Sequence, residues 1–416
     1  MAELDAAERK KRKTEQVEMA EEACLCLVTY EELFVIKLSN LKKQDDDVKD
    51  WTYLLPPPKI EFSLQLPERD LCPFEFDSKI YMAPSAAPRQ NLTKKPGCWR
   101  IYEFKFEERR IELAESLDGV PAPLCWSFIA NTPVSGHVYF YINPRFIDSG
   151  FYVLCPGSRV WKPLNPPPDY SQRGTDLVMF VLHNTVFLSS FTGRGIDSYL
   201  AHFDPIKETW TVEPDSDNNL SKFINDRYNR GLETGSYRAT YPPQISVPLL
   251  GLGSSNNYTV CLTDDKYLGG FPLNTPLEKV FAILVNHQNG RVALYQCLDV
   301  FFEGFQPWIT DMARVNLVDL GNGKVCAILS ADLLDSGSKS LALCFSVFTL
   351  SLLEDFAALQ LDSGAPPMER DFLKVTVHRK CVYIMKNWNP ANYMRHAFVW
   401  PSSKGGRFYH KTLRVL

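Results

Sequence analysis

Residues 155–168 read CPGSRVWKPLNPPP, and residues 51–58 read WTYLLPPP. Both segments contain the pattern Trp-x-x-Leu-x-Pro-Pro-Pro, although Trp51 and Trp161 lie far apart in the chain. An eight-residue phrase that recurs at such a distance indicates a repeated structural unit. The proline triplets are interpreted as rigid connectors between units, with polyproline ligands for SH3-like domains as the alternative.

The tryptophan phrase extends into a longer repeat of about 50 residues. LCPGSRVW at 154–161 aligns with FDPIKETW at 203–210. FKFEERRI at 104–111 is a further copy with Ile111 in the tryptophan place, and VNHQNGRV at 285–292 is a weaker one. In each copy a strand enters, a short turn reverses the chain, and a second strand leaves with a large apolar residue. This pattern is typical of a β-hairpin.

A second phrase recurs upstream of the first. Each copy places polar or Gly residues before a β-branched and often aromatic pair, which is the composition of a strand that follows a turn. Its copies are SKIYM (78–82), GHVYF (136–140), HNTVF (183–187), EKVFA (278–282), GKVCA (323–327) and RKCVY (379–383). The long interval between the third and fourth copies holds either one enlarged repeat or two repeats.

The repeat predicts an all-β fold. Four strands alone cannot bury both faces of a sheet, whereas sheets stacked around an axis can. We therefore expect residues 23–416 to form a single β-propeller of about seven four-stranded blades, or six if the long interval is one enlarged unit. Trp51, Trp161 and Trp210 should then be buried between blades.

The repeat resembles that of a kelch-type β-propeller of the galactose oxidase-like superfamily. Phe203-Asp204-Pro205 followed by Trp210 looks like the end of a kelch blade, and Ile80-Tyr81 and Val138-Tyr139 look like its second strand. The divergent blades are similar to those of plant kelch-repeat proteins, many of which are F-box subunits of ubiquitin ligases. The resemblance implies partner binding through loops on one face, as a substrate receptor or adaptor. The few residues before CLCLV at 24–28 lack a Leu-Pro opening, so no standard F-box is expected.

Bulk composition narrows the class of protein. The net charge of −4 gives no positive field for nucleic acid or an acidic membrane. The longest apolar stretch, LALCFSVFTLSLL at 341–353, is too short to cross a bilayer as a helix and is interpreted as a buried strand pair. Eleven cysteines without a C-x-x-C pair indicate reduced thiols, hence the cytoplasm or nucleus, and Cys24 and Cys26 are expected in the core.

Two segments depart from the repeat. Residues 1–22 form a charged, flexible tail in which Lys10, Lys11, Arg12 and Lys13 are either a nuclear import signal or part of a solvated helix-prone segment. Residues 214–245 are expected to hold a helical insertion that docks on the propeller or binds a partner. Its apolar face comprises Leu220, Phe223, Ile224 and Tyr228, with Gly231 as the expected stop.

The sequence offers no pattern that carries chemistry. Its seven histidines show no H-x-H or H-x-x-x-H spacing, so neither a metal site nor a cofactor is predicted. GLGSSN at 251–256 lacks the third glycine of a dinucleotide loop and is interpreted as a turn. QDDD at 44–47 is interpreted as a solvated loop tip, with a cation site as the alternative. No catalytic residue is therefore predicted.

The function expected is non-enzymatic recognition of a protein partner by a monomer, without nucleic acid or membrane. Trp308 and Trp388 follow loop-like residues and are the predicted partner-binding side chains. The alternative is a hydrolase or isomerase that acts on a small sugar-like ligand in the central channel. An enzyme should gather acids and histidines around the axis, whereas a scaffold should show an apolar or aromatic patch.

Overall fold

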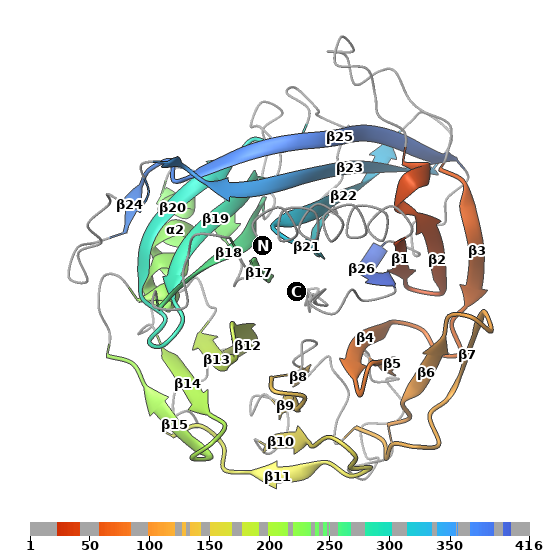
Figure 1. Ribbon diagram of the computed structural model, residues 1–416, viewed down its shortest axis with the longest axis horizontal. Coiled ribbons are helices and arrows are strands. Elements are labelled where there is room, and N and C mark those ends of the chain that lie inside the picture. The colour runs from red at the N-terminus through yellow and green to blue at the C-terminus, as the bar shows by residue number, and fades with distance from the viewer. Residues whose placement is uncertain are drawn as a thin grey trace, which may run out of the picture.

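Antiparallel sheets stand around a common centre in the structure, a computed structural model of the chain (Figure 1). The structure describes residues 23–41, 58–84, 99–120, 127–129, 134–142, 150–168, 177–190, 199–214, 219–233, 238–240, 244–247, 249, 257–267, 279–301, 314–334, 339–354, 356, 367–386 and 394–400. Within these ranges the chain is an all-β propeller of six blades, each built on four antiparallel strands.

The second, third and fourth blades are meanders that run from the centre to the rim. The second contains β4 (Leu71–Phe76), β5 (Lys79–Pro84), β6 (Tyr102–Lys105) and β7 (Arg110–Leu113). The third contains β8 (Ser127–Ile129), β9 (Val138–Ile142), β10 (Gly150–Leu154) and β11 (Lys162–Leu164). The fourth contains β12 (Leu177–Leu182), β13 (Thr185–Ser190), β14 (Leu200–Asp204) and β15 (Thr209–Val212).

The fifth and sixth blades are larger. The fifth contains β16 (Arg238–Thr240), β17 (Ile245–Val247), β18 (Tyr258–Tyr267), β19 (Lys279–Asn286) and β20 (Val292–Leu298), and β24 (Met368–Glu369) pairs in parallel with β20. The sixth contains β21 (Arg314–Gly321), β22 (Lys324–Leu334), β23 (Lys339–Leu352) and β25 (Leu373–Lys386). The segment 341–353 is therefore one long strand followed by a turn, and the expectation of a strand pair was wrong.

The first blade joins strands that are distant in the sequence. Its order is β26 (Met394–Trp400), β1 (Cys24–Thr29), β2 (Glu32–Lys37) and β3 (Ile60–Gln65), with the short helix η1 (Leu38–Asn40) after β2. Antiparallel pairing of β26 with β1 closes the ring. Cys24 and Cys26 on β1 are buried, as expected for small core residues.

The blade number is six, and the expectation of seven is not confirmed. The long interval between the third and fourth copies of the second phrase is one enlarged unit that contains the helix α2 (Leu220–Glu233). Leu220, Phe223 and Ile224 are buried against the fourth and fifth blades, so this apolar face docks the helix on the propeller. The helix continues past Gly231, where a stop was expected.

The tryptophan repeat marks the hairpin between the third and fourth strands of a blade. Phe104 pairs with Ile111 across β6 and β7, and Phe203 pairs with Trp210 across β14 and β15. The weaker copy around residue 290 forms the β19–β20 turn of the fifth blade. There Gly290 has φ +68°, and a Cβ atom would lie 2.5 Å from Cδ2 of Leu200, so glycine is required.

The two described tryptophans of the repeat pack between neighbouring blades, Trp161 buried as predicted and Trp210 half-buried. Trp161 is buried and lies 5.5 Å from the Phe140 ring in a cluster shared by the second and third blades. Trp210 lies 4.9 Å from Phe151 of the third blade, and its Nε1 donates a hydrogen bond to the Asn165 carbonyl. Trp51 lies outside the described residues, as do the segments at 1–22, 44–47 and 251–256.

The second phrase predicts strands correctly but not always their place in the blade. Its copies at 78–82, 136–140, 183–187 and 323–327 open or enter second strands. EKVFA opens β19, a third strand, and RKCVY lies in the middle of β25. The second strand of the fifth blade is β18, whose sequence YTVCLTDDKY does not carry the phrase.

Burial makes the core thiols unreactive. It raises the pKa values of Cys26 and Cys72 well above the ordinary value, and neither forms a disulfide. Among the described residues, none of the helices has the length and apolar character needed to span a bilayer.

Candidate functional site: an apolar cleft between the first and sixth blades

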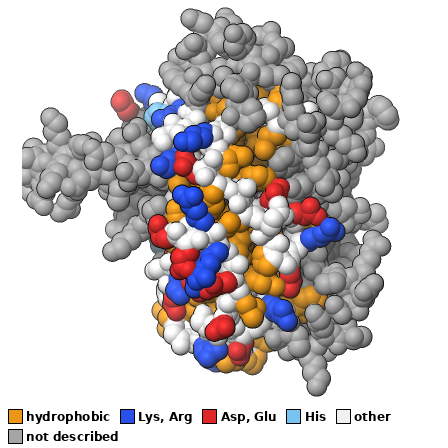
Figure 2. Space-filling model, turned by 90° about the vertical axis from the view of Figure 1, so that its right-hand side faces the viewer, with side chains coloured by type: hydrophobic (Ala, Val, Ile, Leu, Met, Phe, Trp, Pro, Cys, Tyr) orange, Lys and Arg blue, Asp and Glu red, His pale blue; other side chains and the backbone are white. Residues whose placement is uncertain are grey.

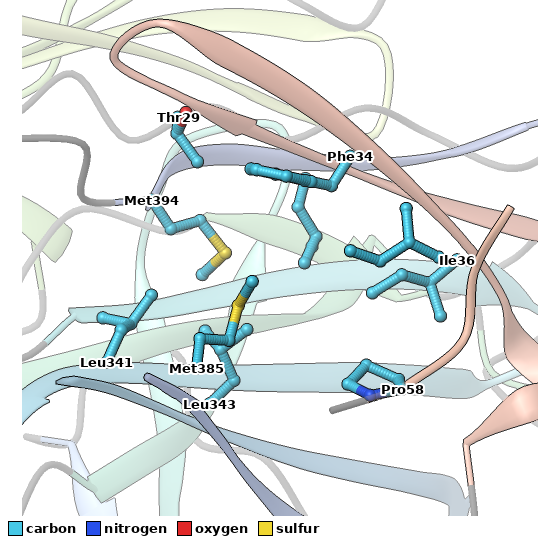
Figure 3. A pocket seen from close by; sticks show the side chains of 10 residues that line it. Thr29, Phe34, Ile36, Pro58, Leu341, Leu343, Met385 and Met394 are labelled. Carbon is cyan, nitrogen blue, oxygen red and sulfur yellow. The ribbon is translucent and has the colours of Figure 1, made fainter. Parts of the chain in front are cut away.

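An apolar cleft opens between the first and sixth blades, next to the seam where the ring closes (Figure 3). Its enclosed volume is about 10 Å³, and the empty space reaches about 360 Å³ only when the open solvent at its mouth is included. Every lining residue except one threonine is apolar. The lining residues are Leu27, Thr29, Phe34, Ile36, Pro58, Ile60, Leu341, Leu343, Met385 and Met394.

Strand alternation places apolar side chains on both walls. Phe34 and Ile36 are two residues apart on β2 and therefore point to the same face of the first blade. On the opposite wall, Leu341 of β23 pairs with Met385 of β25. The cleft continues the buried cluster between these two blades outward to half-buried Phe34 and Met385.

The two methionines give the cleft an adaptable lining. Figure 3 shows the side chains of Met385 and Met394 reaching into it from β25 and β26. A thioether chain is flexible and polarizable, so it adjusts to apolar groups of different shape. The enclosed space is no larger than a water molecule, so entry of an apolar side chain requires these lining side chains to move.

The single polar lining residue is engaged in the fold. The Oγ1 of Thr29 donates a hydrogen bond to the Glu32 carbonyl at 2.9 Å and accepts one from the Glu32 amide at 3.0 Å. These bonds stabilise the turn between β1 and β2. The lining therefore offers shape and apolar surface to a ligand, and it supplies no acid, base or nucleophile.

Arg379 of β25 ties the two walls together. Its Nη1 donates hydrogen bonds to the carbonyl of Leu38 at 2.7 Å and to that of Leu41 at 3.1 Å, at the end of β2. The guanidinium thus satisfies two carbonyls around η1 and holds the sixth blade against the first.

Replacing Arg379 by methionine is expected to lower the free energy of unfolding by about 2 kcal/mol, because two charge-assisted hydrogen bonds are lost and two carbonyls lose a donor. Urea denaturation followed by tryptophan fluorescence measures the effect. Lys374→Met on the same strand, at an exposed position, serves as the control and should change stability little. Equal stability of the two variants would contradict this role for Arg379.

A second apolar area lies on the rim of the first and second blades and is already filled. Figure 2 looks at this rim and shows a band of apolar side chains with charged ones on both sides. Between the first and second blades, Phe106 stacks on Trp400 at 5.6 Å and meets Phe62 edge-on at 5.5 Å, while Arg109 lies over the Phe62 ring. These side chains contact one another and are part of the interface between the two blades.

Titratable side chains gather between the fourth and fifth blades without forming a catalytic group. The rings of His183 and His287 stack at 4.7 Å, and Nδ1 of His202 lies 3.1 Å from Oε1 of Glu213. Burial lowers the pKa of His202 and raises that of Glu213, so both are driven toward their neutral forms. In the described part of the chain no three His, Cys, Asp or Glu side chains come together as a metal site.

The histidines should make stability depend on pH. Burial lowers the pKa of His202 and His287, and His183 lowers that of His287 further. The unfolded chain therefore binds protons more readily, and stability should be lost as pH falls through about 6.5. The thermal unfolding midpoint should be lower at pH 6.0 than at pH 7.5, and His287→Gln should reduce this difference. A pH-independent midpoint over this range would contradict the expectation.

The predicted partner-binding side chains, Trp308 and Trp388, lie outside the part of the chain that the structure describes. The basic run Lys10, Lys11, Arg12 and Lys13 lies outside it as well. The cleft was missed because its walls come from opposite ends of the chain. The available signal was the alternation of apolar residues in ELFVIK and LALCF, which also fits an ordinary core strand.

Comparison with known proteins identifies no family for this chain. No known protein family matches the chain, and no curated protein does either. Similar solved structures include TolB from Acinetobacter baumannii, at 11% identity and a TM-score of 0.34 over 77% of this chain and 60% of that one. The WD40 domain of SCAP from fission yeast is similar at 10% identity and a TM-score of 0.30, over 78% of this chain and 69% of that one. The N-terminal domain of Nup159 is similar at 10% identity and a TM-score of 0.29, over 91% of this chain and 76% of that one. The chain spans less than two thirds of TolB, and similarity at this level does not indicate an activity.

Proposed function

We propose that this chain is a non-enzymatic recognition scaffold, which binds a protein partner by taking an apolar side chain into the cleft between its first and sixth blades. The observation that carries the proposal is the lining of the cleft, in which nine of the ten residues are apolar and the tenth, Thr29, is bonded to its own turn. Exposed apolar hollows on a soluble protein mark places where other molecules bind.

The kelch-like repeat supports a role as a substrate receptor or adaptor, in the cytoplasm or nucleus, acting as a monomer. Within this proposal Trp308 and Trp388, which follow β20 and β25 in the sequence, provide a second contact, and the basic run at residues 10–13 directs nuclear import. Alanine variants of the two tryptophans test that contact separately from the cleft.

Affinity capture from cell extract tests the proposal with a matched pair of variants. Met385→Glu places a charge in the cleft, whereas Met368→Glu makes the same change at an exposed site on β24, remote from it. The wild-type chain and Met368→Glu should retain the same proteins, and Met385→Glu should lose them. The thermal midpoint of each variant shows that it is folded. Equal retention by a folded Met385→Glu chain would refute binding at the cleft.

A further inference from the structure

Two histidines meet across the junction between the fourth and fifth blades. His183 lies in the turn between β12 and β13, and His287 lies in the turn between β19 and β20. Their rings stack with 4.7 Å between the centroids and 25° between the planes. Because two imidazolium charges at this distance repel each other, the contact favours a pair that carries one positive charge at most.

The start of α2 is attached to the same junction. The Leu220 amide donates a hydrogen bond at 3.0 Å to the carbonyl of Gly290, which belongs to the turn that contains His287. On the other side, Oγ of Ser221 lies 2.8 Å from Oγ of Ser190, the last residue of β13. The first turn of the helix therefore contacts both blades, and its attachment depends on the position of the His287 turn.

The other ionisable groups at the junction change charge in the same direction as the pH falls. His202 lies two residues from Leu200, which packs against the fifth blade, and its Nδ1 lies 3.1 Å from Oε1 of Glu213. On acidification the histidines gain positive charge and Glu213 loses negative charge, while nearby Arg291 stays positive. Further charged residues on the packed elements are Asp204 on β14 and Lys222, Asp226 and Arg227 on α2.

We propose that this junction is a pH-sensitive contact that releases the first turn of α2 in acid. Protonation of both stacked rings drives the two turns apart, and movement of the His287 turn breaks the hydrogen bond between Leu220 and Gly290. In the open arrangement both imidazoles reach water and bind protons more readily, so the open population rises as the pH falls. This opening is local, and it is separate from binding at the cleft.

Arg227 limits the opening to the start of the helix. Its guanidinium lies 4.1 Å from the centroid of the Phe281 ring and 5.4 Å from that of Tyr295, both on the fifth blade. Arginine keeps its charge at any pH at which histidine titrates, so its attraction to the two rings does not change. We therefore expect residues 219–224 to open in acid while residues 225–233 stay attached.

Hydrogen–deuterium exchange of the full chain at pH 7.5 and pH 5.5 tests the proposal, with each rate divided by the intrinsic rate at that pH. The protection of the amides at 219–224 should fall about tenfold or more at the lower pH. The amides of β5 and β6, whose strands contain no histidine, should keep their protection. Equal loss throughout the chain would assign the effect to global stability and overturn the proposal, as would unchanged protection at 219–224.

Substitutions at His287 connect the effect to the stacked pair. His287→Gln does not titrate and should remove most of the loss of protection in acid. His287→Arg places a permanent charge beside His183 and should lower the protection of 219–224 about tenfold already at pH 7.5. His378→Gln, which removes a titrating histidine from the sixth blade, is the matched control and should retain the wild-type response. A folded His287→Gln chain that keeps the full acid effect would show that the pair does not control α2.

Discussion

Phe398→Ala is expected to lower the free energy of unfolding by about 3–5 kcal/mol, because it removes a fully buried ring from the strand that closes the propeller. Phe398 lies on β26 opposite Cys26 of β1, and its ring meets Phe104 of the second blade edge-on at 6.1 Å. The cavity would therefore weaken both the closing strand pair and the contact between two blades.

Chemical denaturation followed by circular dichroism measures this loss. Ile206→Ala, at a hairpin tip where the side chain is 92% exposed, removes a comparable apolar group without a cavity and should change stability little. A loss below about 1 kcal/mol for Phe398→Ala would show that the closing strand contributes little to the stability of the ring.

Arg395→Met is expected to cost about 3–5 kcal/mol, because it leaves the Asp70 carboxylate without its cationic partner in a buried site. Nε of Arg395 on β26 lies 3.0 Å from Oδ1 of Asp70, and the two side chains are 12% and 9% exposed. Asp70 directly precedes β4, so the ion pair joins the closing strand to the start of the second blade.

A double-variant cycle separates the pair from its surroundings. Asp70→Asn alone should also destabilise the chain, and Arg395→Met/Asp70→Asn should be more stable than the sum of the single losses predicts, because no unpaired charge remains. Arg69→Met, which breaks the exposed pair with Glu31, is the control and should cost less than 1 kcal/mol. Strict additivity of the two buried changes would contradict a direct interaction.

Most of the fold could be predicted from local sequence patterns. The hairpin that pairs Phe203 with Trp210 spans few residues, so its turn chemistry and its apolar anchors are visible in one short phrase. The same holds for α2, whose buried residues Leu220, Phe223 and Ile224 recur at helical spacing. β18 was not predicted as the second strand of the fifth blade because its sequence lacks the phrase of the other second strands. In this blade the phrase lies on β19 instead.

Features made by distant residues were not predictable. The pairing of β26 with β1, the Arg395–Asp70 ion pair and the two walls of the cleft each join residues from opposite ends of the chain. A single sequence shows that Phe34 and Met385 are apolar, but it does not show that the sixth blade meets the first. The number of blades could not be predicted for the same reason. It depends on the contact between the sixth blade and the first, which closes the ring.

The protein can complete its fold only after β26 has been synthesised, because this strand closes the ring. β1 is translated before the other described strands of the propeller, yet its inner neighbour, Met394–Trp400, is translated after all the other blades. A nascent chain therefore carries an unpaired β1 edge and an open face of the sixth blade until that late segment is free. Over this period it is exposed to aggregation, and we expect it to depend on chaperones that shield strand edges.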